Sequence, residues 1–448
     1  MVHQKRSPAT HAITCGVSSR DEFLFNDGYL NLNHGSFGAI PRAVRDVQRK
    51  YQDACEQRPD VFIRYTFPRL LSASRAAIAS HLSAPKSTVV YVSNATLALN
   101  TVLRNLRYET GDVAIYFSTI YSGIEKTLLY ISETTPLRLH NVPLAHPLSD
   151  GAVLSAFRTA IADIRAAGLT PKFAVYDTES SLPGIRCPFE ALTSICRDEG
   201  ILSCIDGAHG VGHLPLDLGK LDPDFFVSNL HKWLFVPRPC AVLYVPLRHQ
   251  HLMRSSLPTS HGFVPKALEG TINNPLPSTG EPLSAFEVNF EFVGTLDTTA
   301  YIPVSAALEW RRRFVWGEFE GEQAIMGYCF QQAQDAGKIV ALTLGTEILE
   351  NDEQTLGKCC FSNVRLPLDY ATLIGGNEVN WSKVVDVARW IEEVLVTDFG
   401  TFVAVIFLNG AWVVRLSAQV YLTLDDWRMA GEWLKTVCDR AREKKWTC

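Results

Sequence analysis

The sequence lacks the features that mark several specialised classes of protein. It has no apolar run of about 18 residues, which a membrane-spanning helix needs. Its 42 Lys and Arg are balanced by 47 Asp and Glu, for a net charge of −5, so it lacks the positive surface that binds nucleic acid. The N-terminal MVHQKRSPATHAITCGVSS has basic residues but no apolar signal-peptide core. We therefore expect a cytosolic (cytoplasmic) protein whose partner is a small molecule, with no membrane or nucleic acid involved.

The cysteines show no metal-binding pattern. There are 11 of them, without a CxxC or a Cys/His spacing that suits zinc, and several fall in apolar runs. We expect reduced, buried thiols and no metal site. With 448 residues, 47% of them hydrophobic, the chain can bury a large core and divide into two or more domains.

The first two thirds of the chain alternate β-rich runs with amphipathic helical stretches, which predicts an α/β domain with a mostly parallel sheet wrapped by helices. The predicted strands are 89–94, 113–117, 171–177, 201–206, 225–229 and 240–246, and helices are predicted over 154–168 and 189–200. Polar residues follow several strands at the edge where such sheets bind ligands.

A Pro/Gly/Ser-rich segment, 261–282, precedes a change of pattern. Helices are predicted over 300–315, 322–342, 382–395 and 424–445, with a β-hairpin over 402–417 that turns at Asn409-Gly410. We assign residues 1–28 to a flexible N-terminal arm, 29–295 to a large α/β domain, with its N-terminal segment near the site, and 296–448 to a smaller C-terminal α+β domain.

Lys232, in SNLHKWLF, stands among apolar residues three positions after a predicted strand. A desolvated lysine there can have a lowered pKa and form a Schiff base with a carbonyl. Alternatively, its ammonium reaches past Trp233 to solvent.

Two further groups at strand ends have a structural and a functional interpretation. Asp206, in DGAHG, is either a cap or the counter-ion of a cationic group such as a pyridinium nitrogen. Asn94-Ala95-Thr96 is either a plain helix cap or a phosphate site at a helix N-terminus.

In combination, these motifs resemble the class V aminotransferases, which are fold type I pyridoxal-phosphate enzymes, and within them the isopenicillin N epimerase-like branch. The resemblance spans roughly residues 28 to 440. It rests on LNLNHGSFGAIP (30–41), SNAT (93–96), DGAHGVG (206–212), SNLHKW (228–233), FVGTLD (292–297) and RLSAQVY (415–421).

The resemblance implies pyridoxal 5'-phosphate as cofactor, with Lys232 as the Schiff-base lysine and Asp206 as partner of the pyridine nitrogen. It implies that His209 contacts the phenolic oxygen and that Tyr121 lies over the ring and serves as acid or base. The remaining implied cofactor contacts are Asn94, Ala95, Thr96, Asn229, His231 and Thr295, the last lent across a homodimer interface. For the amino-acid substrate, the implied contacts are Arg415, which holds the α-carboxylate, and His34, Ser36 and Arg64.

The implied chemistry passes through an α-carbanion of the bound amino acid, which does not by itself select one reaction. RYTFPRLL (64–71), FSTIYSGIEKT (117–127) and NFEFVGTLD (289–297) resemble fungal hercynylcysteine sulfoxide lyases and favour C–S lysis, a β-elimination from a cysteine-derived or cysteine sulfoxide substrate. Glu179 and His209 depart from that pattern. They leave open a Mannich-type ring closure, as in the loline-pathway enzyme of this branch, or epimerisation or transamination.

Overall fold

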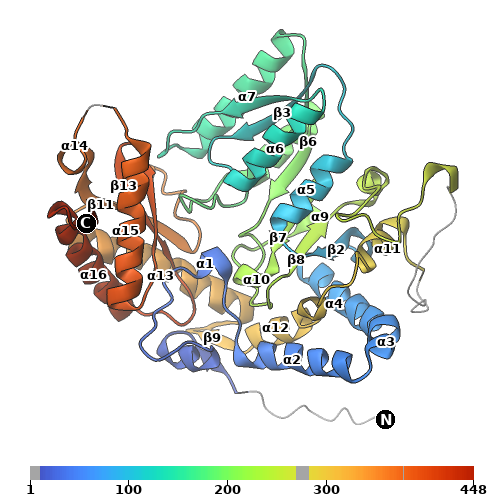
Figure 1. Cartoon of the computed structure of the whole chain (residues 1–448), viewed down its shortest axis with the longest axis horizontal. Helices are drawn as coiled ribbons and strands as arrows, with labels where there is room; N and C mark the ends of the chain where they lie inside the picture. The colour runs from blue at the N-terminus through green and yellow to red at the C-terminus, as the bar shows by residue number, and fades with distance from the viewer. Residues whose placement is uncertain (1–10, 269–281, 377, 448) are drawn as a thin grey trace.

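The computed structural model describes residues 11–268, 282–376 and 378–447, and the predicted large α/β domain is built on a seven-stranded sheet (Figure 1). The strand order is β2-β8-β7-β6-β5-β3-β4. Neighbours run parallel except that β8 is antiparallel to both β2 and β7. The strands are β2 (Val89–Val92), β3 (Asp112–Phe117), β4 (Arg138–Val142), β5 (Thr170–Asp177), β6 (Leu202–Asp206), β7 (Phe225–Asn229) and β8 (Ala241–Tyr244).

Helices cover both faces of this sheet, and successive strand residues are buried on opposite faces. In β5, Phe173 and Val175 join one hydrophobic core and Ala174 and Tyr176 join the other. The first core includes α5 (Ala95–Asn105) and α6 (Ser122–Thr134). The second includes α4 (Phe67–His81), α7 (Asp150–Ala166) and α8 (Phe189–Glu199). The apolar strands are therefore those of a sheet buried on both sides.

The six predicted strands are confirmed to within a few residues at each end, but β4 was missed. β4 is an edge strand that pairs only with β3, and Arg138 to Asn141 are partly or fully exposed. A strand with so little apolar burial has no hydrophobic pattern by which sequence can reveal it.

The smaller domain is α+β, as predicted. Its antiparallel sheet has the order β11-β13-β12, made of β11 (Phe361–Asp369), β12 (Ala404–Leu408) and β13 (Ala411–Ser417). The hairpin turns at Asn409-Gly410, where both residues have positive φ, as a tight two-residue turn requires. The helices around it are α13 (Gly321–Leu344), α14 (Tyr370–Leu373), α15 (Trp381–Phe399) and α16 (Leu424–Arg442).

The predicted flexible arm and the helix predicted over 300–315 both need correction. Of residues 1–28, those from 11 onward are packed: β1 (Ile13–Thr14) pairs with β9 (Phe314–Trp316), which also pairs with β10 (Phe319–Glu320), and Phe23 is buried. Residues 314–316 are therefore strand. The helix itself, α12 (Val304–Arg311), begins after Pro303 and packs on α2 and α4 of the large domain. The large-domain fold thus continues beyond residue 296.

Six further helices, most of them short, lie among the described residues. They are α1 (His34–Phe37), α2 (Arg42–Gln57), α3 (Pro59–Val61), α9 (Leu218–Leu221), α10 (Leu230–Trp233) and α11 (Ala285–Glu291). Figure 1 shows α1 and α10 at the junction of the two domains. Part of the Pro/Gly/Ser-rich segment, residues 269–281, lies outside the described residues. Within the described ranges, no helix has the length and apolarity to cross a bilayer.

Candidate active site

Lys232 lies on α10, which follows β7 without an intervening loop. Its neighbours Leu230 and Trp233 are buried, so the short helix is anchored in the core while the lysine chain extends toward the strand ends. Burial lowers the pKa of Lys232 to about 7, and the positive charge of Arg415 acts in the same direction. The lysine is thus a desolvated amine, not one that reaches past Trp233 to solvent.

His209 faces this amine, with its Nε2 3.0 Å from Lys232 Nζ. The indole N–H of Trp233 donates to His209 Nδ1 over 3.2 Å. An indole nitrogen can only donate, so Nδ1 is an acceptor and, in the neutral ring, Nε2 carries the hydrogen. Burial keeps the ring neutral by lowering the pKa of His209 well below its usual value. The Nε2–H therefore points to Lys232, which accepts it as a neutral amine.

Two buried carboxyl groups end the adjacent strands β5 and β6. Asp177 and Asp206 are in register, and the Asp206 carboxyl accepts a hydrogen bond from Ala208 N at 3.0 Å. Burial raises the pKa of Asp206 to about 6. Burial and the neighbouring Asp206 raise the pKa of Asp177 further. Asp177 is therefore the member of the pair that takes up a proton more readily. Sequence reasoning missed Asp177 although it ends a predicted strand.

The N-terminus of α5 lies beside the end of β7. The Asn94 side chain caps it by accepting from Leu97 N at 2.8 Å, and the Asn229 side chain accepts from Ala95 N at 2.8 Å. Asn229 thus holds the helix start in place, which differs from the direct phosphate contact implied by the resemblance. Thr96 remains exposed at the helix end. The helix N-terminus is suited to an anion.

His231 is fixed next to this helix end. A carbonyl only accepts, so His231 Nδ1 donates to Cys240 O over 2.8 Å and leaves Nε2 as the acceptor nitrogen. Burial lowers the pKa of His231 to about 4, so the ring is neutral at neutral pH.

Arg415, on β13, is buried with 1% of its surface exposed and has no carboxylate partner in the described part of the chain. Its guanidinium donates to Ser181 O at 2.6 Å and to Asn33 Oδ1 and Ser36 Oγ at 2.8 Å each, while Nε has no partner. It also lies 4.7 Å from the Phe361 ring centre. A buried cation without a counter-ion is a site for an anionic ligand.

Two residues predicted to touch substrate instead support the site. His34 donates from Nε2 to the Lys232 carbonyl over 2.8 Å, and its Nδ1 accepts from the Tyr421 hydroxyl at 3.0 Å. Both ring nitrogens are occupied, so His34 fixes the lysine backbone and has none left for a substrate. Ser36 donates to Asn33 Oδ1 at 2.9 Å while it accepts from Arg415, so it orients that guanidinium.

Gly38 makes the close approach of α1 to α10 possible. A Cβ built on Gly38 would lie 1.8 Å from His231 O, and φ is 70°. Only glycine both adopts this positive φ readily and lacks the Cβ that would clash with His231 O.

Three predicted residues are not brought to Lys232 within this protomer. Tyr121 precedes α6 with 48% of its surface exposed, and its hydroxyl bonds no described residue. Arg64 is exposed on the π-helical turn Phe62–Thr66 and pairs with Asp60 at 3.0 Å. Thr295 lies in an exposed loop after α11.

Asn33 and Phe361 are further site residues that sequence reasoning missed. Asn33 lies within LNLNHGSFG, so its motif was noted without its contact to Arg415. Phe361 connects Arg415 with His209, whose ring centre is 5.3 Å away. Its sequence context, KCCFSN, offers no signal, because the contact joins segments from two domains.

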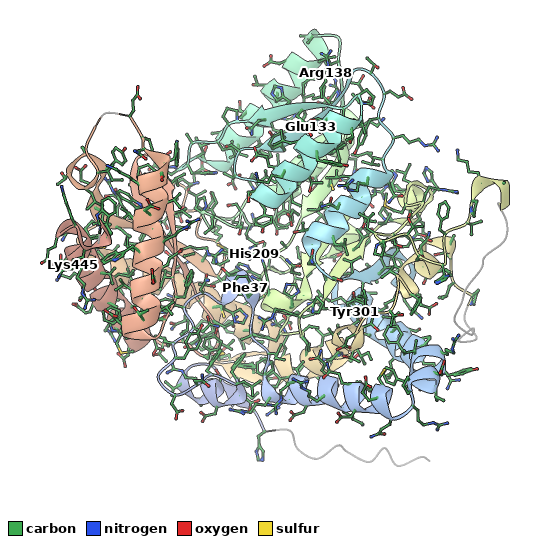
Figure 2. All side chains as sticks on the ribbon, viewed as in Figure 1. Phe37, Glu133, Arg138, His209, Tyr301 and Lys445 are labelled. Atoms are coloured by element: carbon green, nitrogen blue, oxygen red, sulfur yellow. The ribbon has the colours of Figure 1, made fainter. Side chains whose placement is uncertain are left out.

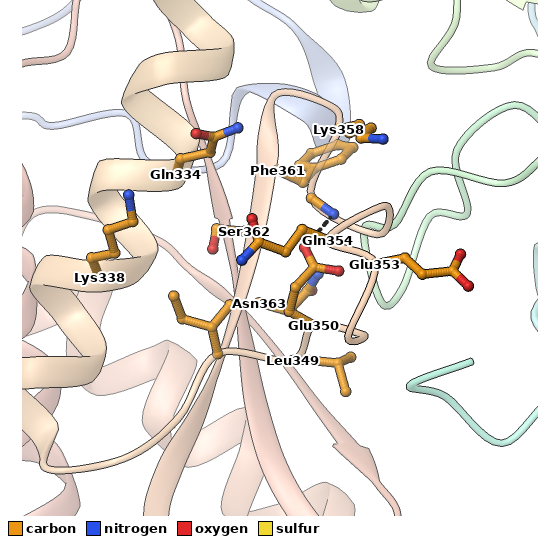
Figure 3. A pocket seen from close by; sticks show the side chains of 12 residues that line it. Gln334, Lys338, Leu349, Glu350, Glu353, Gln354, Lys358, Phe361, Ser362 and Asn363 are labelled. Carbon is orange, nitrogen blue, oxygen red and sulfur yellow. Dashed lines mark hydrogen bonds between the residues drawn. The ribbon is translucent and has the colours of Figure 1, made fainter. Parts of the chain in front are cut away.

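A separate cavity of about 350 Å³ lies in the smaller domain between α13 and β11 (Figure 3). It is lined by Phe361, Asn363 and mostly polar side chains, but by none of the predicted site residues. Asn363 is in register with Arg415 and exchanges two hydrogen bonds with Gly184, at 3.2 and 2.7 Å. The cavity therefore borders the strand that supports Arg415 and does not contain the lysine.

The family model for aminotransferase class-V matches residues 46–324. This chain belongs to that family. As a class V aminotransferase, it is 38% identical to the L-cysteine desulfhydrase-like protein lolT1 of Epichloe uncinata, over 98% of each chain. It is 26% identical to the hercynylcysteine sulfoxide lyase of Schizosaccharomyces pombe, over 94% of this chain and 98% of the relative.

The fold agrees with solved structures of the same architecture. A cystine C-S lyase, C-DES, superimposes with a TM-score of 0.68 at 17% identity, covering 93% of this chain and 98% of that one. The cysteine desulfurase CsdA of Escherichia coli gives 0.66 at 19% identity, covering 95% and 97%. The fold type I architecture predicted from sequence is confirmed.

The cofactor of this class V aminotransferase is pyridoxal 5'-phosphate, and the donor set fits it. A neutral amine at Lys232 suits an aldehyde, the buried carboxylate of Asp206 suits a protonated pyridine nitrogen, and the α5 N-terminus suits a phosphate. In the described residues, no group of three or more His, Cys, Asp or Glu is placed to hold a metal ion.

Proposed function

We propose that this enzyme cleaves the C–S bond of a substituted cysteine by β-elimination, using pyridoxal phosphate. The observation that carries the proposal is Arg415, a buried guanidinium without a carboxylate partner, joined to His209 through the Phe361 ring. It provides the anchor for an α-carboxylate that an enzyme acting on amino acids needs.

The chain's own residues then have distinct tasks. Arg415 binds the carboxylate, held in place by Asn33, Ser36 and the Ser181 carbonyl. The Lys232 amine removes the α-proton, since its lowered pKa leaves it neutral near pH 7. When bound, the cofactor supplies an electron sink for the α-carbon, and Asp206 keeps its pyridine nitrogen protonated. His209 offers Nε2–H to the phenolic oxygen.

The bond changes balance without an external oxidant. The α-proton passes to Lys232, the C–S bond breaks with its electron pair on sulfur, and a proton is delivered to the departing sulfur. We assign that delivery to the Tyr121 hydroxyl, because the side chain is 48% exposed and bonds no described residue. Water then converts the three-carbon remainder to pyruvate and ammonia.

The names of the relatives support C–S chemistry. They include L-cysteine desulfhydrases, such as that of Arabidopsis thaliana at 29% identity over 80% of this chain, and a hercynylcysteine sulfoxide lyase. A cavity of about 440 Å³ favours a substrate larger than cysteine itself. Its wall includes Asn33, which binds Arg415, and the aromatic rings of Phe25, Tyr29, Phe37 and Phe402.

We place the side chain of the bound amino acid toward that cavity, which borders Asn33 but has neither Lys232 nor Arg415 in its lining. Figure 2 shows Phe37 and His209 in the region where the two domains meet. Among the described residues that line the cavity, Arg238 is the only basic side chain, and none is a carboxylate. We therefore expect a leaving thiol or sulfenic acid with a bulky, largely apolar, neutral or anionic substituent.

The decisive experiment incubates the purified holoenzyme with cysteine, S-alkyl and S-aryl cysteines and their sulfoxides. Pyruvate, ammonia and sulfur products are followed by mass spectrometry, with Lys232→Ala as the inactive control. Release of pyruvate and the matching thiol or sulfenic acid is expected. A cyclic product joined by a new C–C bond would favour the Mannich-type alternative. Keto acid without sulfur release would indicate transamination, and inversion of the α-carbon alone would indicate epimerisation.

A further inference from the structure

Glu179 and His213 form a buried pair that no step above uses. Their side chains have no exposed surface, and Glu179 Oε1 lies 3.2 Å from His213 Nδ1. Neither of these two atoms has a hydrogen-bond partner among the described residues, so their contact is close but not aligned as a hydrogen bond. The second carboxyl oxygen, Oε2, accepts from the Thr178 hydroxyl at 2.5 Å. Burial raises the pKa of Glu179 to about 8. Buried polar atoms that lack a hydrogen-bond partner cost free energy of folding.

The backbone determines which nitrogen of His213 carries hydrogen. Cys360 N donates to His213 Nε2 over 2.6 Å. A backbone N–H can only donate, so Nε2 is the acceptor nitrogen. Burial lowers the pKa of His213 to about 3, so the ring is neutral and its hydrogen is on Nδ1. The nitrogen that carries it lies 3.2 Å from Glu179 Oε1, without the alignment of a hydrogen bond. The ring is therefore held by β11 at Nε2 and lies against the carboxyl at Nδ1.

The fixed imidazole packs on Trp233, the residue that follows the lysine. The two ring centres are 4.1 Å apart with an interplanar angle of 34°, and Phe361 meets both rings edge-on at 5.2 and 5.4 Å. The Trp233 indole is thus confined between aromatic neighbours. Its N–H is the donor that determines the tautomer of His209.

We infer that Glu179 and His213 are a positioning pair that fixes the Trp233 indole and thereby keeps hydrogen on Nε2 of His209, facing Lys232. The contacts form a continuous series: Glu179 to His213 at 3.2 Å, His213 to Trp233 by ring packing, Trp233 to His209 at 3.2 Å, and His209 to Lys232 at 3.0 Å. The pair acts on the cofactor-binding side of the site, whichever bond the enzyme breaks.

Glu179 is not placed to act on a substrate. One carboxyl oxygen is taken by Thr178 and the other faces His213. Residues beside it in the chain make two further contacts to the site: Thr178 N donates to Asp206 O at 3.1 Å, and Ser181 O accepts from Arg415. Partners of this outer kind orient contacting residues, and their removal typically costs about 10- to 100-fold in ligand affinity or activity.

The test compares Glu179→Gln with Glu179→Leu in the full-length protein. Glutamine keeps an oxygen for His213 Nδ1–H, whereas leucine keeps the volume and removes the acceptor. Glu190→Gln is the matched control, because Glu190 is an exposed acid on the same segment that pairs with Arg186. Circular dichroism and thermal melts show that each variant is folded.

The primary readout is the ¹⁵N spectrum of histidine-labelled apoprotein, with the His209 signals identified by their loss in His209→Gln. The wild type, Glu179→Gln and Glu190→Gln are expected to show hydrogen on Nε2 alone. Glu179→Leu is expected to show a mixture of tautomers, together with cofactor binding weakened by about 10-fold. Unchanged His209 shifts in Glu179→Leu would overturn the inference.

A second variant keeps the inference testable if Glu179→Leu does not fold. Thr178→Val removes only the hydroxyl that holds Oε2, at nearly constant shape, and is expected to shift His209 in the same direction by a smaller amount. If Thr178→Val is folded and its His209 spectrum matches that of the wild type, the inference fails. Because this readout needs neither cofactor nor substrate, it is independent of the proposed C–S lysis.

Discussion

Asp177 and Asp206 lie directly opposite each other at the carboxyl ends of β5 and β6, yet their pKa values differ. Burial raises the pKa of both carboxyl groups. The negative charge of Asp206 raises the pKa of Asp177 further, so Asp177 is protonated more readily. Two neighbouring acids whose environments separate their pKa values have separate roles.

Amide substitution should distinguish those roles. Asp177→Asn resembles the protonated acid already present and is expected to change kcat by less than about 3-fold. Asp206→Asn removes the charge that we assign to the pyridine nitrogen, and kcat should fall by roughly 10²–10³, the usual size of a lost electrostatic contact to developing charge. Steady-state kinetics of the two variants checks this, and equal losses would contradict the assignment.

The lowered pKa of Lys232 predicts the pH dependence of cofactor capture. The neutral amine attacks the aldehyde, so the rate at which apoenzyme takes up pyridoxal phosphate should rise with pH through a midpoint near the pKa of about 7, not near 10.5. Stopped-flow absorbance measures the rate. Borohydride reduction followed by peptide mapping should then locate the label on Lys232, and a label on another lysine would refute the assignment.

The exposed loop after α11 predicts a shared active site. Leu296, next to Thr295, has 55% of its surface exposed, although the FVGTLD segment matches the family pattern. If Thr295 serves the partner's cofactor, two inactive variants, Lys232→Ala and Thr295→Arg, should complement each other. Random mixing makes half of the dimers mixed, each with one intact site, so about a quarter of wild-type activity should return. No recovery, in a mixture shown to exchange subunits, would exclude the shared site.

Arg415 should affect substrate binding more than turnover. Arg415→Ala removes a charge-assisted contact made in the ground and transition states alike. KM should rise with kcat nearly unchanged, at a cost of about 2–5 kcal/mol in kcat/KM. Arg415→Lys keeps the charge but not the planar fork, so it should recover only part of the loss. Arg365→Ala, an exposed arginine on β11 paired with Glu347, is the control. A fall confined to kcat would contradict the carboxylate role.

Local sequence patterns predicted most of the large domain because all its sheet strands except β4 are largely apolar and its candidate site residues follow them directly. Lys232 and Asp206 were found in this way, and the smaller domain's hairpin was found through Asn409-Gly410. β9 could not be found, because Phe314–Trp316 becomes a strand by pairing with Ile13–Thr14 at the far end of the chain and with the two-residue β10. Sequence alone favoured a helix there.

The supporting contacts of the site were less predictable than its chemical groups. His34 belongs to a recognisable motif, but its two hydrogen bonds, to Lys232 O and to Tyr421, join three distant segments and assign it a positioning role. Phe361 and His213 carry no motif that links them to Arg415 or Trp233. Such roles arise from packing between domains, which leaves no periodic trace in the sequence.

Tyr121 provides the sharpest test of C–S lysis. Its ring is exposed and its hydroxyl bonds no described residue, so the group is available to a departing sulfur. Tyr121→Phe keeps the ring and deletes the hydroxyl. If the hydroxyl protonates the leaving group, kcat should fall by roughly 10²–10⁴ with little change in KM, the size of a lost general acid. The loss should also shrink for substrates whose thiols are more acidic, because a better leaving group needs less protonation. Normal turnover of Tyr121→Phe on substrates with poor and good leaving groups alike would show that Tyr121 is not the acid. The proposal of C–S lysis would then lose the support that it takes from this residue.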